Sequence, residues 1–294
     1  MKAPVPGSRR ALLSRRRLLG GGALAAAGLT GGGGACFLWG ERHFPAIYRV
    51  RAAVSGLPAW LRGYRIAQVS DMHRGPYVTE EYLRRCGALV DSLAPDLVVA
   101  TGDFVDHRVR WAESCAAALS GLRAPDGVFA VLGNHDHWSE DAQQVAAALE
   151  GAGLRMLTNR SARLQRSGRS WWLCGVDDIW SGRPDLDAAL RDVPETGFRI
   201  LLCHEPDFAD RAAAWGIPLQ LSGHSHGGQV RLPGCRPFVA PPYGRKYPQG
   251  LQQVERSPSL VYTNVGLGVI FPPIRLNCRP EVTLLTLDAA RPAA

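Results

Sequence analysis

The sequence predicts an α/β fold in which two mixed β-sheets pack face to face with helices on their outer sides. Between residues 64 and 150, short apolar runs rich in β-branched residues alternate with amphipathic segments, which indicates strands crossed by helices. Between residues 171 and 288, apolar runs follow one another more closely, which indicates further strands. The chain has 294 residues, of which 46% are hydrophobic and 20% charged, so it can bury one large core.

The first half of the domain is predicted to alternate strands and helices. Residues 41–63 are expected to form a connector and a first strand. Thr79 is the expected N-cap of a helix that starts with Glu80 and Glu81, because acidic side chains favour the positive end of a helix. Spacing of three and four residues marks its buried face as Tyr82, Leu83, Cys86, Leu89, Val90 and Leu93. The other elements expected here are strands at 66–70, 97–101 and 128–132 and helices at 111–122 and 140–149.

The second half is predicted to contribute mainly strands. They are expected at 171–176, 200–203, 219–222, 229–232, 260–264 and 282–287. Residues 233–250 are rich in proline and glycine and are expected to form a long surface loop, a kind of segment that is often functional. The sequence contains no internal repeat and no linker to a second domain, so residues 41–294 are predicted to form one domain.

Five polar segments follow five of these expected strands, at the point where each strand ends. In chain order they are Asp71-Met72-His73, Gly102-Asp103, Gly133-Asn134-His135-Asp136, His204 and Gly223-His224-Ser225-His226. Hard divalent cations prefer carboxylate and amide oxygens, and borderline cations also accept imidazole nitrogens. Strand ends that all finish in these groups therefore predict one shared metal site.

The number and spacing of these groups suit two metal ions. Asp71 and His73 are two positions apart, so on an extended backbone they point to the same side, and His224 and His226 repeat that spacing. Asp103 has two carboxylate oxygens, which can bridge two cations. Two cations about 3.5–4 Å apart can clamp a phosphate and activate a bridging hydroxide for in-line attack on phosphorus. The candidate ligands are Asp71, His73, Asp103, Asn134, His204, His224 and His226.

The order of these segments, D-x-H, G-D, G-N-H-D, a single H and G-H-x-H, resembles the calcineurin-like metallophosphoesterase superfamily. The resemblance covers residues 64–288. It implies a four-layer sandwich of two mixed β-sheets between helices. It also implies a metal-dependent phosphoric ester hydrolase, either a phosphodiesterase or a phosphatase. The implied cofactors are two divalent metal ions, and manganese, iron or zinc suit the mixed ligands.

The same resemblance assigns roles to individual residues. One metal would be held by Asp71, His73, Asp103 and His226. The other would be held by Asp103, Asn134, His204 and His224. His135 would be catalytic and would not bind metal. It would stabilise the phosphate and protonate the leaving oxygen, while Asp136 would orient its ring.

Several segments after residue 222 resemble one bacterial branch of the superfamily. They are Gly223-His224-Ser225-His226-Gly227-Gly228-Gln229, Tyr243-Gly244-Arg245-Lys246-Tyr247, Asn264-Val265-Gly266-Leu267-Gly268, Pro273-Ile274-Arg275-Leu276-Asn277-Cys278 and Pro280-Glu281. The branch contains exported or membrane-associated phosphoesterases, some of them twin-arginine dependent. It also contains proteins resembling UDP-2,3-diacylglucosamine pyrophosphatases of lipid A synthesis. Such a pyrophosphatase is one alternative function, and a non-catalytic, membrane-tethered metal-binding protein is another. The implied substrate is a phosphorylated small molecule or a lipid-linked phosphate.

Residues 1–40 are predicted to be a targeting segment. Ser14-Arg15-Arg16-Arg17-Leu18-Leu19 resembles the twin-arginine signal S-R-R-x-F-L-K and leads into a mildly apolar, glycine-rich stretch. The alternatives are an uncleaved anchor across the uncharged residues 18–40 and a lipoprotein attached at Cys36. Each of these places the domain in the periplasm or on the outer face of the cytoplasmic membrane. A twin-arginine signal also makes the twin-arginine export machinery an expected partner.

The basic charge of the chain belongs to this targeting segment. Residues 1–40 contain six basic and no acidic residues, and removing them lowers the formal net charge from +8 to +2. A domain this close to neutral is not expected to bind nucleic acid strongly. Within the domain, Arg74 is a candidate contact for a substrate phosphate or for a surface ion pair. The loop residues Tyr243, Arg245, Lys246 and Tyr247 form either a basic, aromatic rim for the substrate or a solvated loop.

Overall fold

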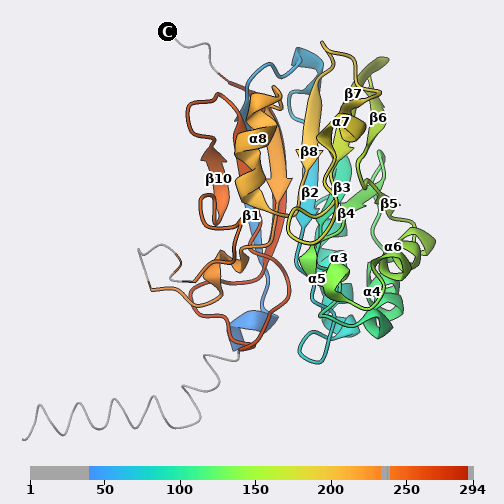
Figure 1. Ribbon diagram of the computed structural model, residues 1–294, viewed down its shortest axis with the longest axis vertical. Coiled ribbons are helices and arrows are strands. Elements are labelled where there is room, and N and C mark those ends of the chain that lie inside the picture. Colours follow the sequence, from blue (N-terminus) through green and yellow to red (C-terminus); the bar gives the residue numbers. More distant parts are fainter. Residues whose placement is uncertain (1–39, 233–236, 238, 291–294) are drawn as a thin grey trace, which may run out of the picture. The chain divides into compact units, whose positions relative to one another are not determined.

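The structure is a computed structural model that describes residues 40–232, 237 and 239–290 (Figure 1). The predicted targeting segment, with its paired arginines and Cys36, lies outside the described residues, and so does Cys235. All the elements below belong to the unit Glu41–Ala294. In the described part of the chain, no helix has both the length and the apolar character needed to span a membrane.

Two six-stranded sheets form the centre of the molecule. The first has the order β1-β12-β2-β3-β4-β5, with bounds Ala46–Val54, Glu281–Ala289, Arg65–Val69, Leu97–Thr101, Val128–Val131 and Arg155–Met156. The second has the order β10-β11-β9-β8-β7-β6, with bounds Gly250–Gln253, Leu260–Thr263, Leu219–Ser222, Arg199–Leu202, Arg169–Gly175 and Arg160–Arg166. Strands β12 and β2 are antiparallel in the first sheet, and the two outer pairs of the second sheet are antiparallel. All other pairs are parallel, so both sheets are mixed.

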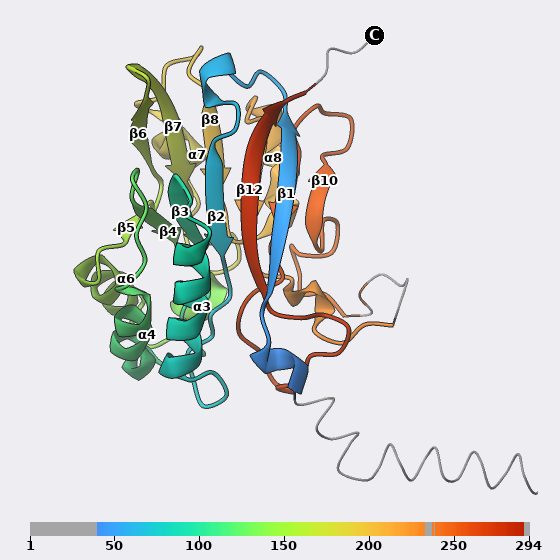
Figure 2. The same cartoon turned by 180° about the vertical axis from the view of Figure 1, so that it is seen from behind.

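Helices cover the outer faces of the two sheets (Figures 1 and 2). The first sheet carries α3 (Glu80–Ser92), α4 (Ala112–Leu119) and α6 (Ala142–Gly151). The second carries α7 (Leu186–Leu190) and α8 (Ala209–Ala214). A short helix, α5 (Asn134–Trp138), follows β4. Five 3-10 turns, η1 to η5, span Glu41–His43, Ala59–Leu61, Val109–Trp111, Pro206–Phe208 and His226–Gly228.

Buried apolar side chains fill the space between the two sheets. Ile66, Val99 and Phe129 of the first sheet pack in one cluster with Trp171 and Leu202 of the second. Each of these side chains is fully buried, so the cluster removes a large apolar area from water, at roughly 25 cal/mol per Å².

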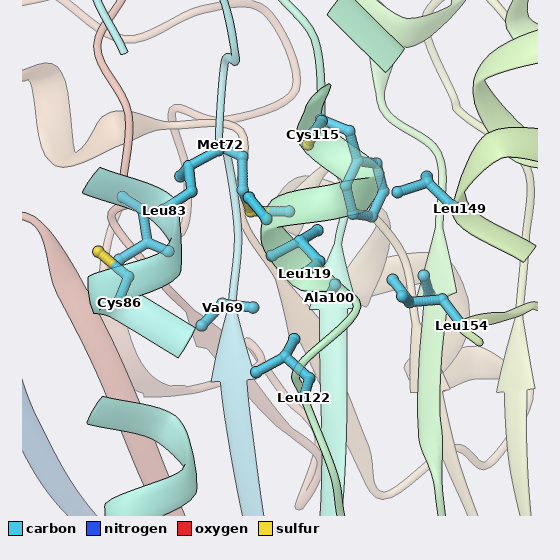
Figure 3. Close-up of a cluster of buried hydrophobic side chains, with 14 of the residues drawn as sticks. Val69, Met72, Leu83, Cys86, Ala100, Cys115, Leu119, Leu122, Leu149 and Leu154 are labelled. Atoms are coloured by element: carbon cyan, nitrogen blue, oxygen red, sulfur yellow. The ribbon is translucent and has the colours of Figure 1, made fainter. Parts of the chain in front are cut away.

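A second apolar cluster holds the helices on the first sheet, and Figure 3 shows part of it. Leu83 of α3, Leu119 of α4 and Leu149 of α6 meet Val69 and Ala100 on the outward side of β2 and β3. A third cluster contains residues of β8, α7 and α8 on the other side of the molecule. The order helix, sheet, sheet, helix confirms the predicted sandwich.

The predicted start of α3 is confirmed, because Thr79 Oγ1 accepts a hydrogen bond from the Tyr82 N–H at 3.2 Å. The helix expected at 111–122 is shorter, since η3 precedes it and α4 ends at Leu119. The first strand expected within residues 41–63 is β1. Sequence patterns therefore located most elements to within a few residues.

The strand predicted at 229–232 is wrong. Gly227, Gly228 and Gln229 all have positive φ, between +54° and +78°, so the backbone here turns and does not extend. Val230 then forms only an isolated bridge with Leu276. The alternating apolar residues that suggested a strand are exposed, with Val230 at 42% and Leu232 at 54%.

The segment 233–250 is predicted to be a surface loop. Its described part packs more closely against the domain than a surface loop would. Tyr247 is only 3% exposed, and its carbonyl accepts a hydrogen bond from Thr263 Oγ1 of β11 at 2.8 Å. Cys174 and Cys203 are buried free cysteines.

Candidate metal centre

The polar segments of the sequence meet at one end of the sandwich. They follow strands β2, β3, β4, β8 and β9, which run parallel to one another within each sheet. His226 Nε2 lies 3.4 Å from Asp71 Oδ1, and His204 Nε2 lies 3.2 Å from Asp103 Oδ2. Since these contacts join side chains of the two sheets, residues far apart in the sequence form one cluster.

The backbone at this cluster is left-handed where the sequence suggested extended chain. Positive φ values occur at Asp71 (50°), His73 (44°), Asp103 (55°), His224 (69°) and His226 (51°). Non-glycine residues rarely adopt this region, and clusters of them mark functional sites. The side chains of Asp71 and His73 therefore do not point to the same side because of an extended backbone, as expected. They do so because the backbone turns sharply directly after the strand.

The first group of candidate ligands contains two carboxylates and two imidazoles. One ligand atom from each of Asp71, His73, Asp103 and His226 lies within 4.8 Å of the others. His73 Nε2 is 3.0 Å from His226 Nε2 and 3.4 Å from Asp103 Oδ2. All four side chains are at most 4% exposed.

The second group shares Asp103 with the first. Ligand atoms of Asp103, His204 and His224 also lie within 4.8 Å of one another. His204 Nδ1 donates to the Thr101 carbonyl at 2.6 Å, which leaves Nε2 facing Asp103. His224 Nε2 donates to the Pro242 carbonyl at 2.8 Å. Such bonds set the tautomer and orientation of an imidazole ligand.

Several buried polar atoms of the cluster have no hydrogen-bond partner among the described residues. Asn134 Oδ1 and His204 Nε2 are two of them, and each side chain is 1% exposed. An unpaired buried acceptor costs about 1–3 kcal/mol unless a ligand binds it. The Nε2 atoms of His73 and His226 lie 3.0 Å apart, and each is beside a carboxylate oxygen. This arrangement is also unfavourable unless a ligand binds these atoms. Divalent cations would satisfy all of these atoms, so the donor set fits metal ions.

The electrostatics of the cluster agree with this fit. Burial lowers the pKa of His73 and of His226 well below the usual range, and it lowers the pKa of His224 to about 4. Burial raises the pKa of Asp71 to about 7. The imidazoles of His73, His224 and His226 are thus neutral, which is the form that binds metal. His204 differs, because, although burial opposes the rise, the Asp103 carboxylate raises its pKa well above the usual value. The buried Asp71 carboxylate lacks sufficient positive charge from the protein.

His135 lies on α5 beside both groups. Its backbone N–H donates to Asp103 Oδ1 at 2.8 Å, and its ring centroid is 4.5 Å from that of His73. The nearest carboxylate to its ring belongs to Asp106, whose Oδ1 is 3.8 Å from Nδ1. Sequence reasoning missed Asp106, although its place three residues after Asp103 in Gly102-Asp103-Phe104-Val105-Asp106 was a signal.

Asp136 was expected to orient the His135 ring, and its contacts are different. Its carboxylate accepts backbone N–H groups from Phe104 at 2.8 Å, Val105 at 3.1 Å and Gly133 at 3.0 Å. Asp136 is fully buried, so these three bonds replace solvent. It holds together the turn that carries Asp103 and the start of α5.

Glycines let these turns approach one another closely. A Cβ atom on Gly102 would lie 2.5 Å from His204 Nδ1, and one on Gly223 would overlap Ser70 and Asp71. Gly102 also has a φ of +94°, which an L side chain rarely adopts. No other residue type fits at these two positions without moving a candidate ligand.

Four of the predicted substrate-binding side chains point elsewhere. Arg74 donates to the carbonyls of Gly75 and Val78 and stacks over the Trp111 ring at 4.4 Å, and it forms no ion pair with another described residue. Lys246 pairs with Asp210 and Glu255, Arg245 donates to the Ala240 carbonyl, and Tyr247 is buried. Of the expected rim, Tyr243 is exposed near Trp180, with ring centroids 6.2 Å apart.

Comparisons with known proteins agree with this geometry. The family model for calcineurin-like phosphoesterases matches residues 64–228. The chain is 35% identical to the uncharacterized metallophosphoesterase YkuE of Bacillus subtilis, over 79% of this chain and 82% of that protein. It is 32% identical to the phosphodiesterase YaeI of Escherichia coli, over 76% and 82%. It is 26% identical to the UDP-2,3-diacylglucosamine pyrophosphatase LpxG of Chlamydia trachomatis, over 85% and 92%.

The chain therefore belongs to the calcineurin-like phosphoesterase family, and it is a metal-dependent phosphoester hydrolase. It spans 58% of the length of some longer animal relatives.

Proposed function

We propose that the protein is a dinuclear phosphodiesterase that acts outside the cytoplasm. The observation that carries the two-metal proposal is the position of Asp103. Its Oδ2 lies 3.4 Å from His73 Nε2 and 3.2 Å from His204 Nε2, and it belongs to both ligand groups. One carboxylate between two sets of imidazoles is the arrangement that a bridging ligand requires.

Each group would hold one divalent ion: manganese, iron or zinc. Asp71, His73 and His226 would complete the first site with Asp103. Asn134, His204 and His224 would complete the second, because the unpaired Asn134 Oδ1 supplies a neutral oxygen next to the His135 position. Such ions supply positive charge to the phosphate oxygens and make water acidic enough to furnish hydroxide near neutral pH.

Side chains of the protein would orient the phosphate and supply the proton that the leaving group takes up. His135 Nδ1 is on the side of Asp106, which leaves Nε2 free to donate to the leaving oxygen. Burial lowers the pKa of His135, so the ring needs a neighbouring anion to hold a proton. Asp106 and the substrate phosphate would both provide this negative charge. In an in-line attack of hydroxide on phosphorus, His135 would give its proton to the leaving oxygen as the bond from that oxygen to phosphorus breaks, so that it departs as the alcohol.

A diester fits the charges better than a monoester. A phosphomonoester dianion usually attracts an additional cationic side chain, and Arg74, the predicted candidate, is held by Trp111 and two carbonyls. A diester carries a single negative charge, so the two cations suffice. The relative YaeI, which is named a phosphodiesterase, supports the same choice.

A pyrophosphatase acting on UDP-2,3-diacylglucosamine is the second candidate. The relative LpxG, which is named for this activity, matches 85% of the chain and supports it. The predicted twin-arginine segment argues against it, because an exported enzyme would not meet a nucleotide substrate made in the cytoplasm. A non-catalytic scaffold is disfavoured because the chain retains His135, which metal binding alone does not require.

The proposal is tested with purified protein stripped of metal and refilled with manganese or zinc. We expect two bound ions per chain by elemental analysis, and turnover of bis-p-nitrophenyl phosphate faster than of p-nitrophenyl phosphate. Asp103→Ala should lose both ions and about 10³-fold or more of the rate, since the bridging group is gone. His135→Ala should keep both ions and lose about 10²–10⁴-fold. Turnover that survives chelation, or full metal content in Asp103→Ala, would contradict the dinuclear site.

A further inference from the structure

Four aromatic side chains form a continuous row beside the candidate metal centre. We call His107, Trp138, Trp180 and Tyr243 the aromatic row. His107 stacks parallel to Trp138, with centroids 5.5 Å apart and 4° between the planes. Trp138 meets Trp180 edge to face at 4.9 Å and 79°, and Trp180 meets Tyr243 at 6.2 Å and 65°.

The aromatic row contacts side chains of the candidate site at three points. The His107 ring lies 4.1 Å from that of His135. The Trp138 ring lies 4.9 Å from that of His135, the proposed acid. The Trp180 ring lies 5.9 Å from that of His224, a proposed ligand of the second metal. A substituent on a phosphate bound between these histidines would therefore extend along the faces of the two tryptophans.

These rings are both exposed and held in place. Trp138 is 40% exposed, Trp180 39% and Tyr243 46%, which is unusual for large aromatic side chains that touch one another. Trp138 ends the same short helix that carries His135, and its Nε1–H donates to Ser181 Oγ at 2.7 Å. The Ser181 N–H in turn donates to buried Asp178. Trp138 is thus held by α5 and by Ser181 without a bound ligand.

The chemistry of the aromatic row is that of stacking. Two cationic groups next to it are already paired: His137 Nε2 is 2.8 Å from Asp177, and Arg108 is 2.7 Å from Glu140. These two groups therefore provide no unpaired cation that could bind a second phosphate. The row does present two tryptophan faces nearly at right angles. An acyl chain would favour an enclosed apolar groove, whereas an open corner of rigid rings suits a flat ring.

We propose that the aromatic row is a subsite for a planar aromatic substituent of the substrate, a nucleobase or aryl ring attached through the phosphodiester. This subsite rests on the proposed phosphodiesterase function and names the class of substrate. Stacking of one base on an aromatic side chain contributes about 1–3 kcal/mol, which corresponds to about 5- to 150-fold in affinity.

Binding is tested first, by calorimetry on the metal-loaded full-length protein. The probes are thymidine 5′-phosphate and tetrahydrofurfuryl phosphate, an abasic analogue that keeps the ring-borne phosphate and lacks the base. We expect the nucleotide to bind about 5- to 150-fold more tightly. Trp138→Ala and Trp180→Ala should each remove most of that difference and leave the affinity for the abasic probe unchanged. The matched control is Trp215→Ala, which removes a tryptophan of equal exposure, 40%, next to α8.

Equal affinity for the two probes in the wild-type protein would overturn the subsite. Tight binding of decyl phosphate that depends on Trp138 would also overturn it, in favour of an acyl-binding surface. Kinetics separate the two proposals. If bis-p-nitrophenyl phosphate is not hydrolysed with any metal, the proposed function fails, and calorimetry still decides the subsite. If it is hydrolysed, Trp138→Ala should raise KM by a factor in the same range, with kcat changed less than twofold.

Discussion

At the scale of single residues, Asp136 shows how a buried carboxylate can position the residues of a site without contacting the reacting atoms. Its three hydrogen bonds go to the backbone N–H groups of Phe104 and Val105, which follow Asp103, and of Gly133 at the entry to α5. Each N–H would otherwise be buried without an acceptor. Asp136 is therefore assigned the role of fixing the position of Asp103, in place of the ring-orienting role expected from the sequence.

Asp136→Ala should therefore cost stability as well as metal affinity. We expect a loss of about 2–4 kcal/mol in the free energy of unfolding, because three buried donors lose their acceptor. The bridging Asp103 should then lose its position, and the metal content should fall below two ions per chain. Urea unfolding and elemental analysis measure the two effects.

A matched control exists elsewhere in the chain. Asp207 also accepts three backbone N–H groups, from Arg245, Lys246 and Tyr247, at 3.0 to 3.2 Å. It is only half-buried, so water can replace its carboxylate. Asp207→Ala should cost about 1 kcal/mol. Equal losses in the two variants, or unchanged metal content in Asp136→Ala, would show that Asp136 has no special part in the site.

At the scale of elements, the segment 177–183 is joined to α5 by side chains from both. Trp138 donates to Ser181, and His137 Nε2 lies 2.8 Å from Asp177 Oδ1. The hydrogen bond to Asp177 raises the pKa of His137 above its usual value, and burial opposes that rise only in part. Asp177 also accepts the Arg183 N–H at 2.8 Å, so the ion pair fixes the loop that carries Trp180.

The stability that this pair contributes should depend on pH in a defined direction. The pKa of His137 is raised in the folded protein, so its contribution is complete below the unfolded value of about 6.5. It is lost as the pH rises through the higher folded pKa. The difference in unfolding free energy between wild type and His137→Gln should thus be largest near pH 5–6 and shrink by pH 8–9.

Urea unfolding across this pH range measures that difference. The variant Asp177→Asn and the double variant complete a cycle, in which the coupling between the two positions should follow the same pH dependence. A difference between wild type and His137→Gln that grows with pH would contradict the ion pair. It would point to a neutral histidine whose role is packing.

At the scale of the whole molecule, the sequence predicted the site residues that directly follow a strand. It did not predict the groups of residues that only contacts between loops bring together. The seven candidate ligands stand directly beside runs of apolar residues, so their strands and their shared end of the sandwich were predictable. The aromatic row was not, because residues 107, 180 and 243 come from three separate loops and residue 138 from the end of α5.

Arg275 is another residue whose role only the fold reveals. It is fully buried and donates to the carbonyls of Val265, Gly266, Gly268 and Cys278. That loop supports the first ligand, since the Gly268 N–H donates to the Asp71 carbonyl at 2.7 Å. Sequence patterns cannot show which carbonyls an arginine will reach, because the left-handed turns that place them depend on tertiary contacts.

The distribution of charge along the chain leads to a prediction about its location. The segment 1–40 holds six of the eight net positive charges, and the domain that follows is nearly neutral. The metal site joins His73 and His226, which are 153 positions apart, so it can hold its ions only after the domain has folded. We predict that the chain is exported through its paired arginines Arg15 and Arg16.

Replacing this pair should therefore keep the protein in the cytoplasm. In a bacterium with a functional twin-arginine pathway, Arg15→Lys with Arg16→Lys should lower the periplasmic and outer-face fraction of the full chain at least tenfold. The positive charge is unchanged in this variant, so the loss would reflect recognition of the guanidinium pair. The matched control, Arg9→Lys with Arg10→Lys, alters the pair that lies farther from the apolar stretch and should leave export intact. Equal export of both variants, measured by cell fractionation and immunoblot, would rule out the twin-arginine signal and favour the anchor at residues 18–40.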